Sequence, residues 1–187
     1  MFRLISQKLR RFSRDTRGST SIELILFTPL LFMMLAAAFV FYDAYRQKAI
    51  NTNAAYTISD ALSRETDAID NTYLDGLHKL LEFLVQDNAQ VGMRVTVVRY
   101  DGYEAKYYAD WSETRGPLYP LTDRDLNTSL MGNLPTLLHN ERVIVVETSS
   151  TYTPVVEIAG LAEQELYNFA FTRPRFAPKL ELQMAGL

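Results

Sequence analysis

The sequence contains no cysteine among its 187 residues. Disulfide bonds, a thiolate nucleophile and a cysteine-ligated metal site are therefore excluded. Histidine, the side chain that most often titrates near neutral pH, occurs only twice. A chain of this length has room for one anchored domain with a modest core, and that domain must be stabilised by its core alone.

Charged residues are missing from Leu24–Tyr42, a run of 19 mostly apolar residues. A helix of this length spans about 28 Å, which matches the hydrocarbon core of a bilayer. A buried helix of a soluble protein fits less well, because the run is long. A cleaved secretory signal is a closer alternative, but its apolar region usually has about 7 to 15 residues and a small-residue cleavage site follows it. Because Ala36–Ala38 lie within the run instead, the sequence favours a retained membrane helix.

The two flanks of this run differ in charge. Six basic residues and one acidic residue up to Arg17 give +5, which leaves −8 for the rest of a chain whose net charge is −3. Membrane proteins keep basic flanks in the cytoplasm. Arg10, Arg11, Arg14 and Arg17 are interpreted as a topology signal that contacts lipid, and no nucleic-acid partner is expected. The amino terminus is therefore predicted to be cytoplasmic, and the acidic remainder exported.

Beyond Tyr42 the apolar residues follow a helical period. Ile50, Ala54, Ile58 and Leu62 recur at every fourth position, which predicts that the membrane helix continues into water as one long rod. A second helix is predicted over about 69 to 87. Its apolar face consists of Leu74, Leu77, Leu80, Leu81, Leu84 and Val85.

Later segments follow the two-residue period of strands. G-M-R-V-T-V-V-R-Y and Y-E-A-K-Y-Y-A-D-W flank Asp101-Gly102, a dipeptide typical of two-residue hairpin turns. The return strand should carry Tyr103, Ala105, Tyr107 and Ala109 on one face, with one face of the sheet buried and the other wet.

Three more elements are predicted toward the carboxyl terminus. A short helix with a capping box of Thr122 and Asp125 closes near Gly132. A β-branched strand then stops at Pro154, and a last strand ends at Pro174.

Candidate catalytic residues are few. His78 and His139 lack an acidic or histidine partner at ligand spacing, so exposed polar positions explain them. Ser149 and Ser150 lack the glycines of a nucleophile elbow. The sequence therefore predicts a protein that is not an enzyme and has no catalytic or metal site.

Two other groups of residues have structural interpretations. Asp60, Glu65, Asp67 and Asp70 lack the order of a calcium-binding loop and are interpreted as a solvated helix face. The eleven tyrosines fit cross-strand pairs better than a binding surface. No cofactor and no small-molecule substrate are expected.

An acidic residue stands at the start of the apolar run. Residues Thr16 to Leu24 read T-R-G-S-T-S-I-E-L, in which Glu23 is the fifth residue after Gly18. This arrangement resembles the processing motif of type IV prepilins, in particular the Flp class of tight-adherence (Tad) pili. The resemblance implies that a membrane-embedded aspartic peptidase cuts between Gly18 and Ser19, and that Glu23 neutralises the terminal amine of a neighbouring subunit during assembly. The alternative is a Glu23 that lies at the membrane boundary and reaches the lipid headgroups.

Further stretches narrow this resemblance. Flp pilins are very short, whereas more than a hundred residues follow the apolar run here. The chain is similar to the TadE/TadF group of minor pseudopilins, which typically begin R-R-F-x-R-D-x-R-G and have an early proline in the membrane helix. Arg10 to Gly18 read R-R-F-S-R-D-T-R-G, and Pro29 matches the proline, whereas Leu24 stands where Tyr or Phe is frequent. The complete leader and the strand V-I-V-V-E-T-S-S-T-Y-T-P favour a TadE-like protein.

The expected molecule is an α+β protein with three parts. They are a basic prepilin-type leader at 1–18, a transmembrane helix at 19–43, and a periplasmic head at 44–187 with a roughly four-stranded antiparallel sheet packed on helices. The resemblance implies a single-pass minor pseudopilin of the bacterial inner membrane that acts in pilus assembly, adhesion and biofilm formation. Its partners would be other pilins and pseudopilins, the prepilin peptidase and inner-membrane lipid. The alternative from another class is an unprocessed, membrane-anchored periplasmic binding module whose tyrosine-rich sheet captures a ligand.

Overall fold

A computed structural model of the chain describes residues 19–85, 90–154 and 162–183. The chain divides into two compact units, Met1–Tyr42 and Asp43–Leu187. One helix, α2 (Ser19–Arg64), belongs to both units and is continuous over 46 residues. The predicted continuation of the apolar helix beyond Tyr42 is therefore confirmed.

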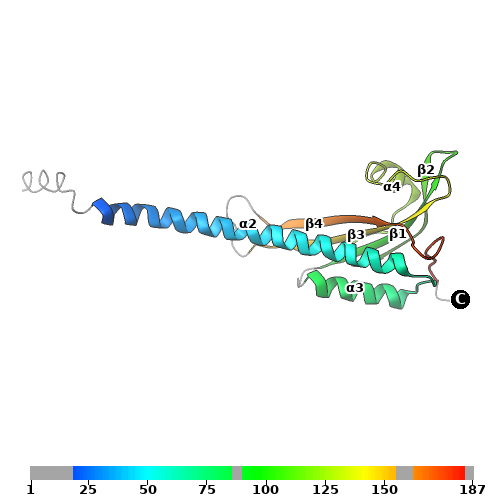
Figure 1. Ribbon diagram of the computed structural model, residues 1–187, viewed down its shortest axis with the longest axis horizontal. Helices are drawn as coiled ribbons and strands as arrows, with labels where there is room; N and C mark the ends of the chain where they lie inside the picture. Colours follow the sequence, from blue (N-terminus) through cyan, green and yellow to red (C-terminus); the bar gives the residue numbers. More distant parts are fainter. Residues whose placement is uncertain (1–18, 86–89, 155–161, 184–187) are drawn as a thin grey trace, which may run out of the picture. The chain divides into compact units, whose positions relative to one another are not determined.

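The second unit is an α+β head built on one sheet (Figure 1). Its strands are β1 (Gly92–Asp101), β2 (Lys106–Arg115), β3 (Arg142–Tyr152) and β4 (Gln164–Thr172). They lie in the order β2-β1-β3-β4, and each neighbouring pair is antiparallel. The expected fold class, with a long apolar helix and a four-stranded antiparallel sheet packed on helices, is confirmed.

One face of the sheet packs against the second half of α2 and against α3 (Asn71–Val85), which lie side by side in Figure 1. Ile58 and Leu62 of α2 are completely buried there, as the helical period predicts. The apolar face of α3 is narrower than predicted, because Leu80 is 37% exposed. The buried residues of this first core include Ala54, Ile58, Leu62, Leu74, Leu77, Leu81, Val85, Met93, Val95, Val97, Ile144 and Val146.

The opposite face of the sheet packs against α4 (Asp123–Thr128) and the turns that follow it. The capping box is confirmed: the Thr122 hydroxyl accepts a hydrogen bond from the Asp125 amide, and the Asp125 carboxylate accepts one from the Thr122 amide. Leu126 is completely buried against Val143 and Val145 of β3. The expectation of one wet face is therefore wrong, because α4 covers part of it.

The turn between β1 and β2 is longer than predicted. Asp101 pairs with Lys106, so the residues from Gly102 to Ala105 form the connection. The Asp101 carboxylate accepts a hydrogen bond from the Tyr103 amide at 2.8 Å, and Ala105 has a positive φ of 54°. Tyr103 and Ala105 thus belong to the turn, while only Tyr107 and Ala109 of the predicted face pack on the second core.

A segment that follows all four strands closes the end of α2. The Arg175 amide donates to the Ser63 carbonyl at 2.9 Å, and the Trp111 indole donates to the Leu180 carbonyl at 2.9 Å. Ile69 pairs with this segment as well, through hydrogen bonds to Glu181 and Gln183. Leu180 is almost fully buried in the first core.

Candidate functional site

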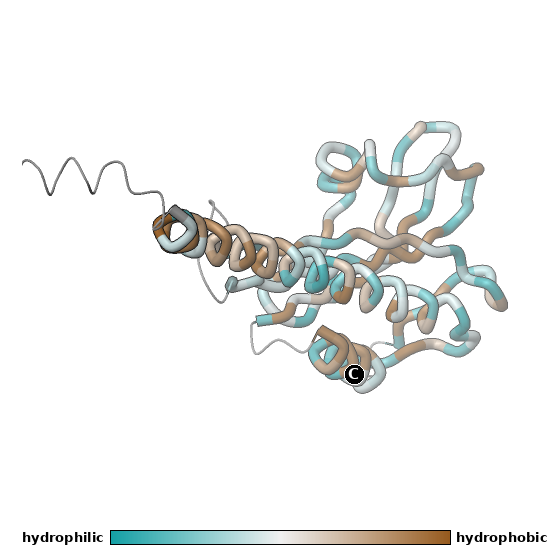
Figure 2. Tube along the Cα trace, turned by 60° about the vertical axis from the view of Figure 1, so that its left-hand side comes forward, coloured by the Kyte–Doolittle hydropathy of each residue, from teal (hydrophilic) through white to brown (hydrophobic). Residues whose placement is uncertain are grey.

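The amino-terminal half of α2 exposes apolar side chains around its whole circumference. With the exception of Val40, which is only 4% exposed, the large apolar side chains between Ile22 and Tyr42 expose between 43% (Phe41) and 74% (Ile25) of their surface. A helix that is apolar on every side belongs in a protein core or in a membrane. By length and composition α2 could cross a bilayer, and its most apolar window is almost unburied within the protein. This half-helix suggests a membrane anchor or a signal, and Figure 2 shows its mostly hydrophobic colouring.

Glu23 is the only charged residue between Ser19 and Tyr42, and it is exposed. It lies at the fifth position of α2, beyond the first turn. Its neighbours one turn further along the same face are Leu26 and Phe27, which offer no polar partner. Thr20, one turn earlier, is polar but uncharged, so a partner of opposite charge must come from outside residues 19–42.

Pro29 lies within α2 and removes one backbone donor. The carbonyl of Ile25, four residues earlier, is the acceptor that loses its helical partner. Beside it, the Thr28 hydroxyl donates a hydrogen bond to the Leu24 carbonyl at 2.5 Å. The helix between Glu23 and Pro29 is thus locally weakened in its backbone hydrogen bonding, although it stays continuous.

The remaining predicted site residues are placed as follows. Ser19 is the first residue of α2. Gly18, Arg10, Arg11, Arg14 and Arg17 lie outside the described residues. The structure therefore brings Glu23 and Pro29 together on one helix and leaves the leader undescribed.

The polar residues considered for catalysis in the head have structural partners. The ring Nε2 of His78 lies 2.9 Å from the Val91 carbonyl, and His139 Nδ1 accepts a hydrogen bond from the Gly102 amide. The Ser150 hydroxyl donates to Asn51 at 2.6 Å and so links β3 to α2. Within the described ranges no group of three or more His, Asp or Glu is arranged to hold a metal ion.

The acidic stretch between α2 and α3 also has local roles. Asp60 forms ion pairs with Arg64 and Arg175, and Glu65 accepts a hydrogen bond from the Tyr73 hydroxyl. The Asp70 carboxylate accepts from the Tyr73 amide at 2.7 Å, which caps the start of α3. These contacts stabilise the end of α2 and the start of α3. The acidic residues therefore serve as ion-pair and capping partners and not as ligands of a cation.

Two tyrosines pair across strands, as the sequence favoured. Tyr100 and Tyr107 are register partners on β1 and β2, and their ring centroids lie 4.9 Å apart. Tyr107 is buried in the second core. This pair contributes packing to the second core.

A buried ionic cluster escaped the sequence analysis. Glu147 of β3 has no exposed surface, and Arg94 of β1 binds both of its oxygens, from Nε at 2.6 Å and from Nη2 at 2.5 Å. Tyr167 of β4 donates its hydroxyl to the same carboxylate, and Arg94 also donates to the Tyr119 carbonyl at 2.8 Å. A charged residue inside the apolar run V-I-V-V-E-T was the available signal.

The contacts with Glu147 stabilise the charged form of Arg94. Burial lowers the pKa of Arg94, but the hydrogen bonds and the charge of Glu147 raise it by more. Burial, followed by the hydrogen bond to Glu147 and its charge, raises the pKa of Tyr167. The cluster joins β1, β3 and β4, and its enclosed carboxylate is suited to holding strands together, not to reacting with a substrate.

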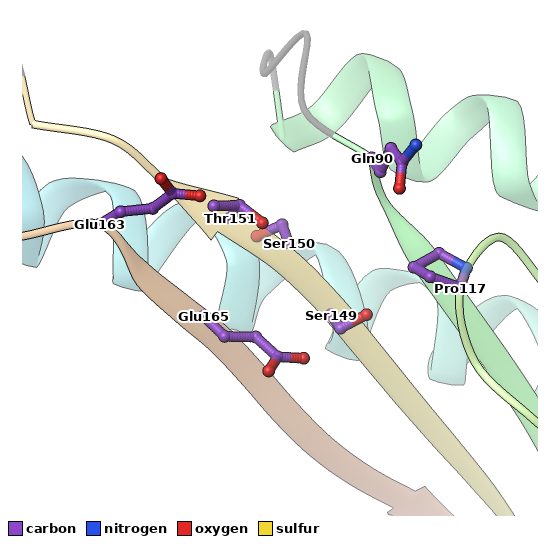
Figure 3. A pocket seen from close by; sticks show the side chains of 7 residues that line it. All are labelled: Gln90, Pro117, Ser149, Ser150, Thr151, Glu163 and Glu165. Atoms are coloured by element: carbon purple, nitrogen blue, oxygen red, sulfur yellow. The ribbon is translucent and has the colours of Figure 1, made fainter.

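An open polar cleft of about 450 Å³ lies at the end of the sheet where β3 ends and β4 begins (Figure 3). Hydroxyls of β3 and two carboxylates from the start of β4 lie opposite Pro117 in this view. Its lining consists of Gln90, Pro117, Ser149, Ser150, Thr151, Glu163 and Glu165. Such a surface offers hydrogen bonds to a polar ligand but no aromatic platform.

The helix and the head together define a class of protein. A long hydrophobic amino-terminal helix followed by a head with an antiparallel sheet is a pilin-like architecture. Comparisons with protein-family models, with curated proteins and with solved structures find no match.

Proposed function

We propose that this chain is a minor pseudopilin of the tight-adherence (Flp, type IVc) pilus. The observation that carries the proposal is the first half of α2, which is apolar on every side and has a single carboxylate, Glu23. The second half of the same helix packs in the core of an α+β head. In this role the protein spans the bacterial inner membrane once, with its amino terminus cytoplasmic and its head periplasmic. It acts in pilus assembly and thereby in adhesion and biofilm formation.

Processing would create a partner of opposite charge for Glu23, which is otherwise an unpaired carboxylate in the membrane. Cleavage after Gly18 removes the basic leader and gives Ser19 a free α-amino group. In hydrocarbon, a carboxylate and an ammonium each carry a large desolvation cost, which a close pair between them offsets. No basic residue lies between Ser19 and Tyr42, so an amine of a neighbouring subunit is a fitting partner for Glu23.

Two other features of α2 suit packing in a bilayer. Ala36–Ala38 are small, and small residues let helices approach closely in membranes. Pro29 lowers the cost of a local change in the helix, since one backbone hydrogen bond is already absent. Both features favour contacts of α2 with pilin helices and lipid.

The first experiment is intact-mass analysis and amino-terminal sequencing of the full chain from native membranes, with and without the prepilin peptidase. A chain that begins at Ser19 only in the presence of the peptidase would support the proposal. Gly18→Val is the matched control and should stay uncut. A wild-type chain that keeps its leader in both membranes would refute processing.

A Glu23→Gln chain tests the charge pair. It should insert into the membrane normally but give markedly fewer pili, because the neutral amide cannot compensate an ammonium. Glu104→Gln, which changes an exposed carboxylate of the head, should assemble as wild type does. Wild-type piliation of Glu23→Gln would refute the charge-pair account.

A second candidate is an unprocessed, membrane-anchored binding module. The polar cleft beside Glu163 and Glu165 is the observation that favours it. This candidate requires an intact leader and tolerates Glu23→Gln, so the two experiments above separate it from the pseudopilin. Substitution of Glu165 should then abolish function, whereas a pseudopilin with that change should still be processed.

A further inference from the structure

The two edges of the sheet differ in how their backbones are covered. At the β2 edge, the Tyr107 amide donates to Asn127 of α4 at 2.9 Å, and Asn127 donates back to the Tyr107 carbonyl at 2.7 Å. Asp123 of α4 accepts from the Ala109 amide at 2.8 Å. A bulge follows, because Val97 pairs with Trp111 and Val98 with Ala109. Side-chain caps and a bulge are the means by which edge strands are protected from pairing.

The β4 edge has no such protection in the described part of the chain. β4 pairs with β3 on one side, and its backbone makes no hydrogen bond to a described residue on the other. The nine residues of β4 contain no proline or lysine and a single charged residue, Glu165. A long, weakly charged, open edge is a template for an additional strand.

Aromatic side chains stand beside this open edge. Tyr167 and Phe171 are 46% and 47% exposed on the face of the sheet that carries α4. Phe169 lies between them, with its ring centroid 6.3 Å from that of Phe171. A strand added at the edge would bury this aromatic row with its alternate side chains.

Charges at the two ends of β4 specify the chemistry of such a strand. Glu163 and Glu165 lie at its start, and Arg173 and Arg175 follow its end. The two arginines are 62% and 56% exposed, although each contacts a carboxylate of its own chain. An antiparallel ligand strand therefore fits best with an acidic start, an apolar alternating centre and a basic end.

A second copy of the chain does not fit this edge when both copies are anchored in one membrane. Pairing of β4 with β2 of a copy is blocked by α4. Antiparallel pairing of two β4 strands turns the Asp43–Arg64 segments of the two copies in opposite directions, because α2 runs alongside β4 from Asp43 to the Arg175 contact. Parallel pairing in register places Glu165 of one copy beside Glu165 of the other, and the two like charges repel each other.

We propose that the β4 edge is a docking site for an extended segment of a different protein, which adds to the sheet as a fifth strand antiparallel to β4. The segment has Asp or Glu opposite Arg173, apolar residues opposite the row Tyr167, Phe169 and Phe171, and Lys or Arg opposite Glu165. This interaction goes beyond the proposed function and does not depend on processing or on Glu23.

The sequence of β4 itself supplies a probe. A synthetic peptide of residues 163–175 laid antiparallel on β4 places its Arg173 opposite Glu165, its Glu165 opposite Arg173, and Phe171 opposite Tyr167. Binding of the labelled peptide to the full chain in nanodiscs is measured by fluorescence anisotropy. Hydrogen exchange of the complex should show new protection within β4 and none in β2.

Variants then test the edge and its orientation. Phe171→Lys should weaken binding by at least about tenfold, because a cation enters the apolar row beside Arg173. Tyr103→Lys, in the exposed β1–β2 turn, is the matched control and should bind as wild type does. Glu165→Lys should also weaken binding, and a peptide with Glu in place of its Arg173 should restore it.

Each outcome of these experiments either supports or overturns the proposed docking edge. Binding with protection of β4 and restoration by the charge-swapped peptide supports an antiparallel docking edge. Absence of binding, or protection at β2 instead, overturns it. Two peptide-free chains that crosslink through β4 within one nanodisc, and no longer do so with Phe171→Lys, overturn the assignment to a different protein in favour of a second copy.

Discussion

Single residues show how the head tolerates charge in its interior. Glu147 is enclosed completely and depends on Arg94 and Tyr167 for its hydrogen bonds. A Glu147→Gln change leaves Arg94 largely buried without a counter-charge, so it should lower the free energy of unfolding by about 3 kcal/mol. Urea denaturation of the full chain in detergent measures this loss.

Two comparisons isolate the ion pair. Glu181→Gln, which breaks the exposed pair with Lys179, should leave the free energy of unfolding close to the wild-type value. The double variant Arg94→Met, Glu147→Leu should be more stable than Glu147→Gln, because it leaves no buried charge uncompensated. A double variant that is less stable than the single one would show that the cluster stabilises the head beyond charge compensation.

Tyr167 makes the free energy of unfolding depend on pH in the alkaline range. Burial and the neighbouring Glu147 carboxylate raise its pKa above the ordinary value of 10.0, so the folded chain holds a proton that the unfolded chain has lost. Its contribution is complete below pH 10 and declines as the pH rises through the raised folded-state value. Tyr167→Phe should therefore reduce the loss of stability above pH 10, measured by urea midpoints across pH. Tyr103→Phe, in the exposed turn, should keep the wild-type profile.

The two halves of α2 differ in how their apolar side chains are distributed around the helix. α2 is apolar on all sides in its first half and amphipathic in its second. Ile58→Ala should lower the free energy of unfolding by about 2 to 5 kcal/mol, because the side chain is completely buried between α3 and the sheet. Thr57→Ala, one position along and exposed, should change it by less than about 0.5 kcal/mol. Equal effects in urea denaturation would contradict this placement of α2.

The sequence was most informative about elements with a clear period. The continuous helix, both late strands and the capping box at Thr122 could be predicted, because each depends on residues close in sequence. The β1–β2 turn could not be predicted from Asp101-Gly102, since the Asp101 side chain binds the Tyr103 amide and extends the connection. Coverage of β2 by α4 depends on contacts between residues about twenty apart, such as Tyr107 and Asn127, which no local pattern encodes.

For the candidate site, too, the sequence predicted local features but not the contacts between residues on different strands. Glu23 and Pro29 stood out in the sequence because each is an exception within an apolar helix. The cleft residues Ser149 and Glu165 come from different strands, so only the register of β3 and β4 brings them together. The open edge of β4 also depends on the strand order, which alternation alone does not determine.

At the scale of the whole molecule, the head should be separable from the apolar half-helix. Both cores are formed by residues from Ala54 onward. A fragment of residues 43–187 should therefore be soluble and unfold cooperatively, whereas the full chain should need detergent or lipid. Size-exclusion chromatography and circular dichroism of the two chains check this. An unfolded or aggregated fragment would show that residues before Asp43 stabilise the head.

The segment around Arg175 and Leu180 has a consequence for biosynthesis. It comes after all four strands, yet it supplies the partner of the Ser63 carbonyl, fills the first core and binds Trp111. A chain emerging from the ribosome in order has α2 ready long before this closing piece exists. The head can therefore complete its folding only after these residues have been translated, and export that begins during translation delivers a head whose first core is still incomplete.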